Sequence, residues 1–281
     1  MSTSSYEETL PNEVGCIEWK GVDRLHSVTT KRGTHVEMVY RPEYGISCFM
    51  DGSIQSCERD ERIYHEALVH PVMMASPNRK RVMIIGGGEG ATAREVLKWS
   101  DVQEVHMFEW DKEVVDLFKE KYPEWSKGAW NDPRLTLFYE DIFERIQEIP
   151  STLYDLIIID LFDPSDENMA CWHTLMMHVH NWIHTEGSIV LYAGMRNRIG
   201  KEQMYETLLR SMKATKEVSA HILPVHGHIT PYRVFIPSFL GESVFLLFQS
   251  TYHNREPPFD TMNVSSHITN QIWNSYKTFN W

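Results

Sequence analysis

Cysteine is scarce in this sequence, and its few residues are not paired by spacing. The chain of 281 residues has four, Cys16, Cys48, Cys57 and Cys171, with no CxxC pair. This pattern favours reduced thiols in the cytosol over a disulfide framework or a zinc site. No apolar run approaches the roughly 18–20 residues that span a bilayer. The polar, acidic start MSTSSYEETLPNE matches neither a secretory signal nor a transit peptide. We therefore expect a cytoplasmic protein without a membrane partner.

Positive charge is also in short supply. Lys and Arg number 27 against 39 Asp and Glu, which gives a formal net charge of −12. A field of that sign argues against binding to nucleic acid and concentrates small cations. A requirement for solubility is the simpler explanation of this net charge, unless the functional site itself is acidic. Internal repeats and low-complexity segments are absent, and the length suits one large α/β domain or a domain with a small appendage.

Secondary-structure patterns divide the chain into three predicted regions. Residues 1–60 hold short alternating segments such as HVEMVYR and GISCFMDGSIQS, which are typical of strands and hairpins. Residues 61–251 open on the helical pattern DERIYHEALVHPVMMA and then alternate strand-like and helix-like pieces. That alternation predicts βαβ units and a parallel sheet. Residues 252–281 are polar and are expected to be a surface extension that packs some of its aromatic side chains.

A glycine-rich turn, VMIIGGGEGATARE, follows the first strand of the predicted parallel sheet. Gly86, Gly88 and Gly90 allow a tight turn and a close approach to a ligand at the N-terminus of the next helix. The signal is weak by itself, because the packing of a helix against a strand also requires glycine. The spacing is not GxGxxG, which weakens a dinucleotide interpretation.

Acidic residues end successive predicted strands, and this context strengthens the nucleotide interpretation. Glu89, Glu109, Asp141 and Asp160 follow the first four strands in turn. One such acid is often only a helix cap. Four of them line the carboxyl edge of the sheet, where open α/β folds bind ligands. We expect a pocket for adenosine, as in an S-adenosyl compound, with Glu109 on the ribose and Asp141 near the adenine amino group.

The stretch YDLIIIDLFDPSDE places two carboxylates where a hydrophobic strand ends. Asp160 is the last residue of that predicted strand, and Asp163 follows just before Pro164. Both acids could simply cap turns. Asp160 also stands at the edge of the predicted sheet where open α/β folds bind ligands.

Several ordered motifs together resemble the aminopropyltransferases, the spermidine and spermine synthases. They are MDGSIQSCERDERIYHEALVHP, RVMIIGGGEGATARE, MFEWD, DPRLTLFYEDIFE and YDLIIIDLFDP. The resemblance runs from about Asp51 to Pro164, and more loosely to FIPSFLGES. GGGEG, ATARE and YHEALVHP look most like the thermospermine synthase branch. The family implies a Rossmann-like domain with a small N-terminal β domain, and a homodimer or homotetramer.

The resemblance also implies a reaction and its substrates. The donor would be decarboxylated S-adenosylmethionine, the acceptor a small cationic diamine or polyamine, and the by-product 5′-methylthioadenosine. No tightly bound cofactor and no metal are implied. Glu109 would hold the donor's ribose, Asp141 and Ile142 would meet the adenine, and Glu89 would contact the aminopropyl amine, beside the backbone of Gly86 and Gly88.

On the acceptor side, the resemblance implies a channel for the amine. Tyr64, His65 and Asp163 would line it, and Gln55, from the DGxxQ motif, would lie near the same cleft. Asp160 would accept the proton of the attacking amine, with Tyr64 sharing its hydrogen bond. His65 could instead be a buried, hydrogen-bonded core histidine.

Three departures from the family pattern bear on substrate contacts. The Tyr-Gln pair of an early strand would fall near Gly33, Thr34 and His35, where there is no glutamine. The segment SDENMACWH, with Glu167, replaces a Gly-Pro-Ala-like loop. Phe239 stands in the segment where the family often has a tyrosine.

Two alternative functions remain open. An amine N-methyltransferase could use ordinary S-adenosylmethionine on the same scaffold, although an extra acid at Glu89 would repel the carboxylate of that donor. A catalytically silent paralogue could bind a polyamine or nucleoside and regulate a partner. The histidine pairs 178/180 and 226/228 lack the carboxylate spacing of metal sites, so we expect surface or packing roles for them. Packing roles are also expected for four tryptophans, Trp99, Trp110, Trp125 and Trp130.

Overall fold

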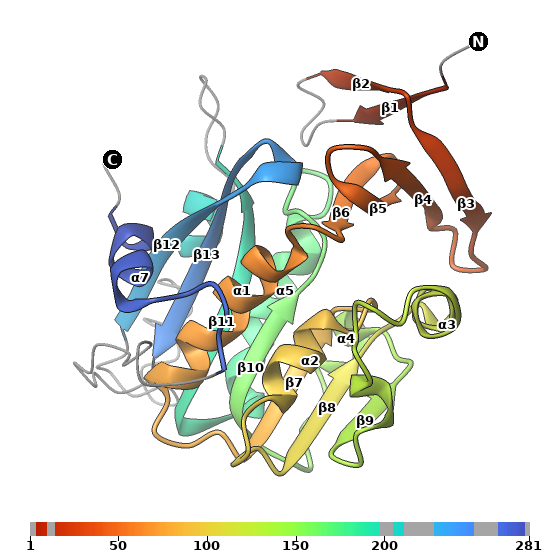
Figure 1. Cartoon of the computed structure of the whole chain (residues 1–281). Helices are drawn as coiled ribbons and strands as arrows, with labels where there is room; N and C mark the ends of the chain where they lie inside the picture. The colour runs from red at the N-terminus through yellow and green to blue at the C-terminus, as the bar shows by residue number, and fades with distance from the viewer. Residues whose placement is uncertain (1–3, 10–14, 197–204, 211–227, 250–263, 279–281) are drawn as a thin grey trace.

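The computed structural model describes residues 4–9, 15–196, 205–210, 228–249 and 264–278. These residues form three β-sheets and a set of helices around the largest sheet (Figure 1). Within them, no helix is both long enough and apolar enough to cross a membrane.

The N-terminal residues form two antiparallel sheets, as the alternating segments predicted. The first pairs β1 (Ser5–Thr9) with β2 (Cys16–Lys20). The second has four strands in chain order: β3 (Asp23–Thr29), β4 (His35–Arg41), β5 (Gly45–Met50) and β6 (Ser53–Cys57). Asp51 and Gly52 turn β5 into β6 with φ of +49° and +81°, values that favour short polar residues and glycine.

The large sheet has seven strands in the order β12-β13-β11-β10-β7-β8-β9. β7 to β11 run parallel, and β12 and β13 are antiparallel additions at one edge. The bounds are β7 (Arg81–Gly86), β8 (Glu104–Phe108), β9 (Leu135–Phe138), β10 (Tyr154–Asp160), β11 (Ile183–Met195), β12 (His228–Ile236) and β13 (Gly241–Gln249). The predicted parallel α/β fold is confirmed.

Helices cover both faces of this sheet, because its central strands are apolar on both sides. Ile84 and Ile158 point to the face that α1 covers, whereas Ile85 and Ile157 point to the face that α5 covers. The helices are α1 (Glu61–Ala75), α2 (Ala91–Leu97), α3 (Lys112–Lys121), α4 (Ile142–Arg145), α5 (Met169–His178) and α7 (Asn270–Tyr276). Short 3-10 turns are η2 (Ala129–Asn131), η3 (Val179–Trp182) and η4 (Pro237–Phe239).

Helix α1 packs across strands β10 to β13 of the sheet (Figure 1). It continues through Pro71 to Ala75. Proline has no N–H to donate to the carbonyl four residues earlier. That carbonyl, of Ala67, instead accepts a hydrogen bond of 2.7 Å from the Tyr232 hydroxyl on β12. This contact satisfies the backbone and fixes α1 to the sheet.

The described part of the C-terminal tail packs against α1. The buried Glu66 carboxylate accepts hydrogen bonds from Ser265, Ser266 and the backbone of His267. Trp273 and Tyr276 of α7 are buried in the same core as α1. The expected packing of aromatic side chains is therefore found, while residues 250–263 and 279–281 lie outside the described part of the chain.

Candidate active site

The carboxyl end of β10 lies beside the glycine-rich turn that follows β7. Gly86 is paired with Asp160, and the Gly87 N–H donates to the Asp160 carbonyl at 3.1 Å. A Cβ on Gly86 would stand 2.1 Å from that carbonyl oxygen, and the φ of Gly86 is +81°. Gly88 is less crowded, because its Cβ would stand 3.0 Å from the Glu109 Oε2. The turn therefore needs glycine for packing, whether or not a ligand approaches it.

The Asp160 carboxylate is fixed by two donors from different helices. The Tyr64 hydroxyl of α1 donates to Oδ1 at 2.8 Å, and Thr92 Oγ1, in the first turn of α2, donates to Oδ2 at 2.5 Å. Burial, reinforced by Asp160, raises the pKa of Tyr64 well above its usual value, so the phenol stays protonated and donates. Asp160 is half-buried, which leaves this oriented carboxylate within reach of a ligand.

Asp163 is held by a tyrosine that the sequence analysis did not single out. The Tyr192 hydroxyl on β11 donates to Asp163 Oδ1 at 2.6 Å. Burial raises the pKa of Asp163, and this hydrogen bond opposes the rise. The rings of Tyr64 and Tyr192 meet edge to face with their centroids 5.4 Å apart. The two Tyr–Asp pairs thus stand side by side.

Aromatic side chains enclose these pairs. The Tyr64 ring lies near Phe245 and, with a centroid distance of 6.0 Å, near Phe239. Phe239 therefore fills space beside Tyr64 without contributing a hydroxyl. Its turn is held to the start of α1, because Asp60 accepts hydrogen bonds from the Ser238 backbone and hydroxyl.

The segment after Asp163 forms a small closed loop. Asn168 donates from its side chain to the Asp163 carbonyl at 2.9 Å and accepts from the Ser165 N–H at 2.8 Å. Glu167 is exposed on this loop. The substitution of SDENMACWH for a Gly-Pro-Ala-like segment therefore produces an ordered turn at the edge of the site.

Glu109 directly follows β8 and faces the glycine-rich turn. Its Oε1 accepts a hydrogen bond of 3.0 Å from the Asp111 N–H. Burial raises its pKa from 4.5 to about 7, and the nearby charges of Asp111 and Asp160 add to the effect. Asp111 caps α3 and also accepts from Thr30 of the N-terminal sheet at 2.6 Å. The β3–β4 turn is therefore tied to the edge of the large sheet beside Glu109.

Asp141 has the capping role that single acids at strand ends often have. It is the N-cap of α4 and accepts from the Phe143 N–H at 2.8 Å. Ile142, the next residue, is buried in the core beneath the sheet edge. Contacts of either residue with an adenine remain a prediction.

His65 lies between two carboxylates. Its Nε2 is 2.6 Å from Glu89 Oε1, and its Nδ1 is 2.9 Å from Glu61 Oε2. The His65 ring is therefore buried and hydrogen-bonded at both nitrogens, as the core-histidine alternative predicted. Glu89 is half-buried and shares the electrostatic environment of Asp160.

Gln55 and His35 both make hydrogen bonds within the N-terminal sheet. Gln55 is half-buried on β6, and its amide donates to the Ser53 carbonyl at 3.3 Å. β6 packs against the η4 turn that carries Phe239. His35, near the place of the missing glutamine, hydrogen-bonds through its N–H to Asp51 at 2.9 Å.

Thr92 and Tyr192 are the two contacts that sequence reasoning missed. Thr92 has a recognisable signal, because it opens the helix after the glycine-rich turn. Tyr192 alternates with Leu191 along β11, so its side chain falls on the α1 face of the sheet. That alternation was readable, but the pairing with Asp163 was not.

The histidine and tryptophan predictions are only partly met. His180 is buried, whereas His226 lies outside the described residues. The described residues include no cluster of His, Cys, Asp or Glu that could hold a metal. Trp99 and Trp125 are buried, and Trp130 packs on Gly90. For Trp110 the prediction of packing is wrong, because it is 44% exposed beside Glu109.

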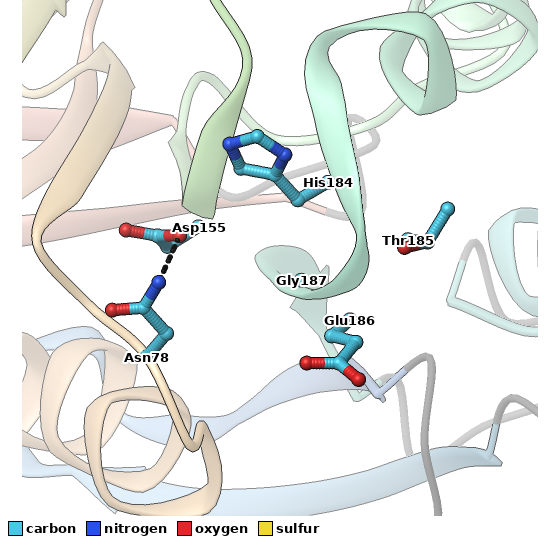
Figure 2. Close-up of a pocket in the computed structure, with 6 residues that line it drawn as sticks. All are labelled: Asn78, Asp155, His184, Thr185, Glu186 and Gly187. Carbon is cyan, nitrogen blue, oxygen red and sulfur yellow. Dashed lines mark hydrogen bonds between the residues drawn. The ribbon is translucent and has the colours of Figure 1, made fainter.

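Two cavities lie away from the carboxylates. One, of about 250 Å³, is lined by Asn78, Asp155, His184 and residues 185–187 (Figure 2). It sits at the amino end of β10, the opposite end from Asp160, where ligands of open α/β sheets do not bind. Its Asp155 already accepts from Asn78 and from the Arg81 N–H. The other cavity, of about 390 Å³, adjoins α1, α2 and Ser265.

Comparison with known proteins identifies the family of this chain. The family described as the spermine/spermidine synthase domain matches residues 61–257. Polyamine aminopropyltransferase 1 of Hyperthermus butylicus is 37% identical over 74% of this chain and 69% of its own length. The polyamine aminopropyltransferase of Pyrobaculum calidifontis is 33% identical over 78% of this chain and 73% of its own.

Solved structures agree on the fold. The spermidine synthase from Thermotoga maritima has a TM-score of 0.79 at 20% identity, covering 99% of this chain and 93% of that one. A spermidine synthase bound to the transition-state analogue AdoDATO has a TM-score of 0.85 with the same identity and coverage. The predicted enzyme class, a polyamine aminopropyltransferase, is confirmed by the curated relatives. The chain belongs to the spermine/spermidine synthase family.

Proposed function

We propose that this protein transfers the aminopropyl group of decarboxylated S-adenosylmethionine to a diamine or polyamine, with Asp160 as the proton acceptor. One observation carries the proposal: the Asp160 carboxylate is oriented by Tyr64 and Thr92 at the carboxyl edge of the sheet. Glu89 and Asp163 add acidic groups on either side of it, which suits a ligand with several amines.

The chemistry needs alignment and a neutral amine. The amine nitrogen attacks the carbon next to the sulfonium; an N–C bond forms, the C–S bond breaks, and 5′-methylthioadenosine leaves. Free aliphatic amines have a pKa near 10, so most are protonated at neutral pH. Asp160 first binds the ammonium by a charge-assisted hydrogen bond and then takes its proton, while the aromatic walls favour the neutral amine.

The donor would lie along the edge formed by β7, β8 and α4. Glu109 would accept hydrogen bonds from the ribose hydroxyls, and Asp141 and Ile142 would meet the adenine. The backbone at Gly86 and Gly88 would pass beneath the nucleoside. Burial raises the pKa of Glu109 to about 7 in the free protein, and two hydroxyl donors from a ribose would stabilise its ionised form.

The acceptor would extend from Asp160 towards Asp163 and Gln55. The edge-to-face pair of Tyr64 and Tyr192 offers apolar surface for methylene groups between the two carboxylates. The thermospermine-like motif YHEALVHP supports a long acceptor such as spermidine.

A product screen by mass spectrometry tests the proposal. The purified protein is incubated with putrescine, cadaverine, spermidine or spermine, and with decarboxylated or ordinary S-adenosylmethionine. We expect a gain of one aminopropyl group with the decarboxylated donor only, and the acceptor that gains it identifies the branch. A methyl gain with ordinary S-adenosylmethionine would overturn the proposal in favour of a methyltransferase. A folded protein that binds 5′-methylthioadenosine but modifies no amine would favour a silent paralogue.

A further inference from the structure

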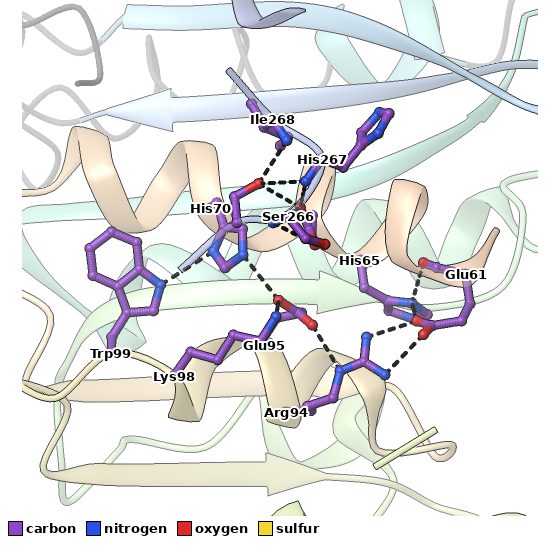
Figure 3. A network of polar contacts seen from close by, with 12 residues as sticks. Glu61, His65, His70, Arg94, Glu95, Lys98, Trp99, Ser266, His267 and Ile268 are labelled. Atoms are coloured by element: carbon purple, nitrogen blue, oxygen red, sulfur yellow. Dashed lines mark hydrogen bonds and ion pairs between the residues drawn. The ribbon is translucent and has the colours of Figure 1, made fainter. Parts of the chain in front are cut away.

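A row of charges of alternating sign runs from Glu89 to Lys98 along α1 and α2. Figure 3 shows the part of this row from His65 to Lys98. Glu89 pairs with His65, and His65 pairs with Glu61. Arg94 clamps Glu61 with two hydrogen bonds, of 3.0 and 2.8 Å, and contacts Glu95 at 2.8 Å. At the surface end Glu95 meets Lys98 at 2.5 Å.

The partners of His65 restrict its protonation state. Its Nε2 faces Glu89 Oε1, and its Nδ1 faces the carboxylate and the backbone carbonyl of Glu61. A carbonyl can only accept a hydrogen bond, so Nδ1 carries a proton in every arrangement. Two arrangements satisfy these contacts. Either His65 is an imidazolium and Glu89 an anion, or His65 is neutral and Glu89 carries the proton.

Glu61 favours the charged arrangement. Burial alone would raise its pKa, but hydrogen bonds from His65 and Arg94 lower it, so Glu61 remains an anion. Burial would likewise lower the pKa of His65, but Glu89 and Glu61 raise it well above its usual value. The Arg94 guanidinium is always charged, so it stabilises the Glu61 carboxylate as an anion.

Glu89 depends on this arrangement for its charge. Burial raises its pKa, and the anions Asp160 and Glu61 raise it further. Burial, with a smaller effect of the Glu89 charge, raises the pKa of the Cys48 thiol on β5 well above its usual value, so this thiol stays protonated. The charge and hydrogen bond of His65 oppose these effects. A neutral His65 would leave a neutral Glu89, which could not pair with an ammonium group.

We propose that Arg94 and Glu61 are positioning residues that hold His65 as an imidazolium, and that this imidazolium keeps Glu89 anionic for the amine end of the donor. His65 itself then repels ammonium groups and acts through Glu89 instead of touching substrate. The part that concerns the donor rests on the proposed aminopropyl transfer, whereas the charge of His65 does not.

Nuclear magnetic resonance of the ligand-free protein tests the charge of His65. Its ring signals are assigned by their loss in His65→Gln and followed from pH 5 to pH 9. We expect imidazolium shifts at neutral pH in the wild type, and a transition at lower pH in Glu61→Gln than in the wild type. Glu104→Gln is the matched control, because it removes a carboxylate 2.9 Å from His106 at the far end of β8 and should leave His65 unchanged. A neutral His65 at pH 7 in the wild type would overturn the proposal.

Glu61→Gln leaves Arg94 without one buried partner and could impair folding. Arg94→Lys is the second variant, because lysine keeps the positive charge but cannot donate the two parallel hydrogen bonds that Arg94 makes to Glu61. It should move the His65 transition in the same direction by a smaller amount. An unchanged His65 transition in both variants, if both are folded, would refute the positioning role.

Calorimetry separates this role from general damage to the site. 5′-Methylthioadenosine lacks the aminopropyl amine, so its affinity should change less than twofold in Glu61→Gln at pH 8. The affinity for decarboxylated S-adenosylmethionine should fall about tenfold or more, as expected for a lost charged contact. Equal losses for both ligands would overturn the proposal. If the wild type binds neither ligand, the proposed function fails, while the resonance experiment still decides the charge of His65.

Discussion

Glu109→Gln should stabilise the free protein at pH 8 while weakening its binding of nucleosides. The Glu109 carboxyl is held by burial at a pKa of about 7, against an ordinary value of 4.5. Burial favours the protonated carboxyl, so ionisation of Glu109 lowers the free energy of unfolding of the folded protein. Glutamine has nearly the same shape, can accept the Asp111 N–H hydrogen bond through its carbonyl oxygen, and does not titrate.

The direction of the pH effect on the free energy of unfolding follows from the protons bound to Glu109 in the folded and unfolded states. Between pH 4.5 and pH 7 the folded protein keeps a proton on Glu109 that the unfolded chain has lost, so stability falls as pH rises through this window. At about 1.36 kcal/mol for each factor of ten in proton affinity, the cost above pH 7 is at most ~3 kcal/mol. Water that reaches the half-buried carboxylate reduces it. The variant avoids this cost.

Urea unfolding at pH 5 and pH 8 measures the effect. The free energy of unfolding of Glu109→Gln, relative to wild type, should rise by about 2 kcal/mol between the two pH values. Glu104→Gln is the control, because Arg81 lowers the pKa of Glu104 in the folded state, so its linkage to stability lies below pH 4.5 and its stability difference should be nearly the same at pH 5 and pH 8. A stability difference for Glu109→Gln that is the same at pH 5 and pH 8 would refute the reasoning. Wild-type affinity for 5′-methylthioadenosine should rise between pH 6 and pH 8 as Glu109 ionises, and the variant should lose this rise.

Three other substitutions test separate parts of the site. Asp160→Asn should lower kcat by about 10²–10⁴ and leave 5′-methylthioadenosine binding intact, and turnover near wild type at saturating substrates would remove Asp160 from the mechanism. Tyr192→Phe removes the hydroxyl that donates to Asp163 and lowers its pKa. More of Asp163 is then protonated near neutral pH, so KM for the amine should rise several-fold, and more at pH 6.5 than at pH 8.5. A change in KM that is the same at both pH values would count against this account. Glu66→Gln should cost about 2 kcal/mol in urea unfolding at pH 8 because the tail loses its charged acceptor. Hydrogen bonds from the tail lower the pKa of Glu66, so this loss should shrink as pH falls below about 4.5, and a loss that stays constant with pH would contradict it.

The sequence by itself determined the large sheet and the edge at which its acids gather. Apolar strands that alternate with helices can be buried only as a parallel sheet, and in such a sheet every strand ends at the same side. Glu89, Glu109 and Asp160 therefore had to meet there. The order of motifs also identified the family, because each motif is local and readable in one stretch of chain.

Only the tertiary structure decided which partners those acids have. Tyr64 and Asp160 are 96 residues apart in the chain, and Thr92 is 68 residues from the same carboxylate. Periodicity reports which face a side chain takes but not which residue of another element it meets. The same limit hid the contact of Tyr192 with Asp163 and the position of His65 between two carboxylates. Because charge states in a buried site depend on such contacts, the chemistry of these acids was settled by packing.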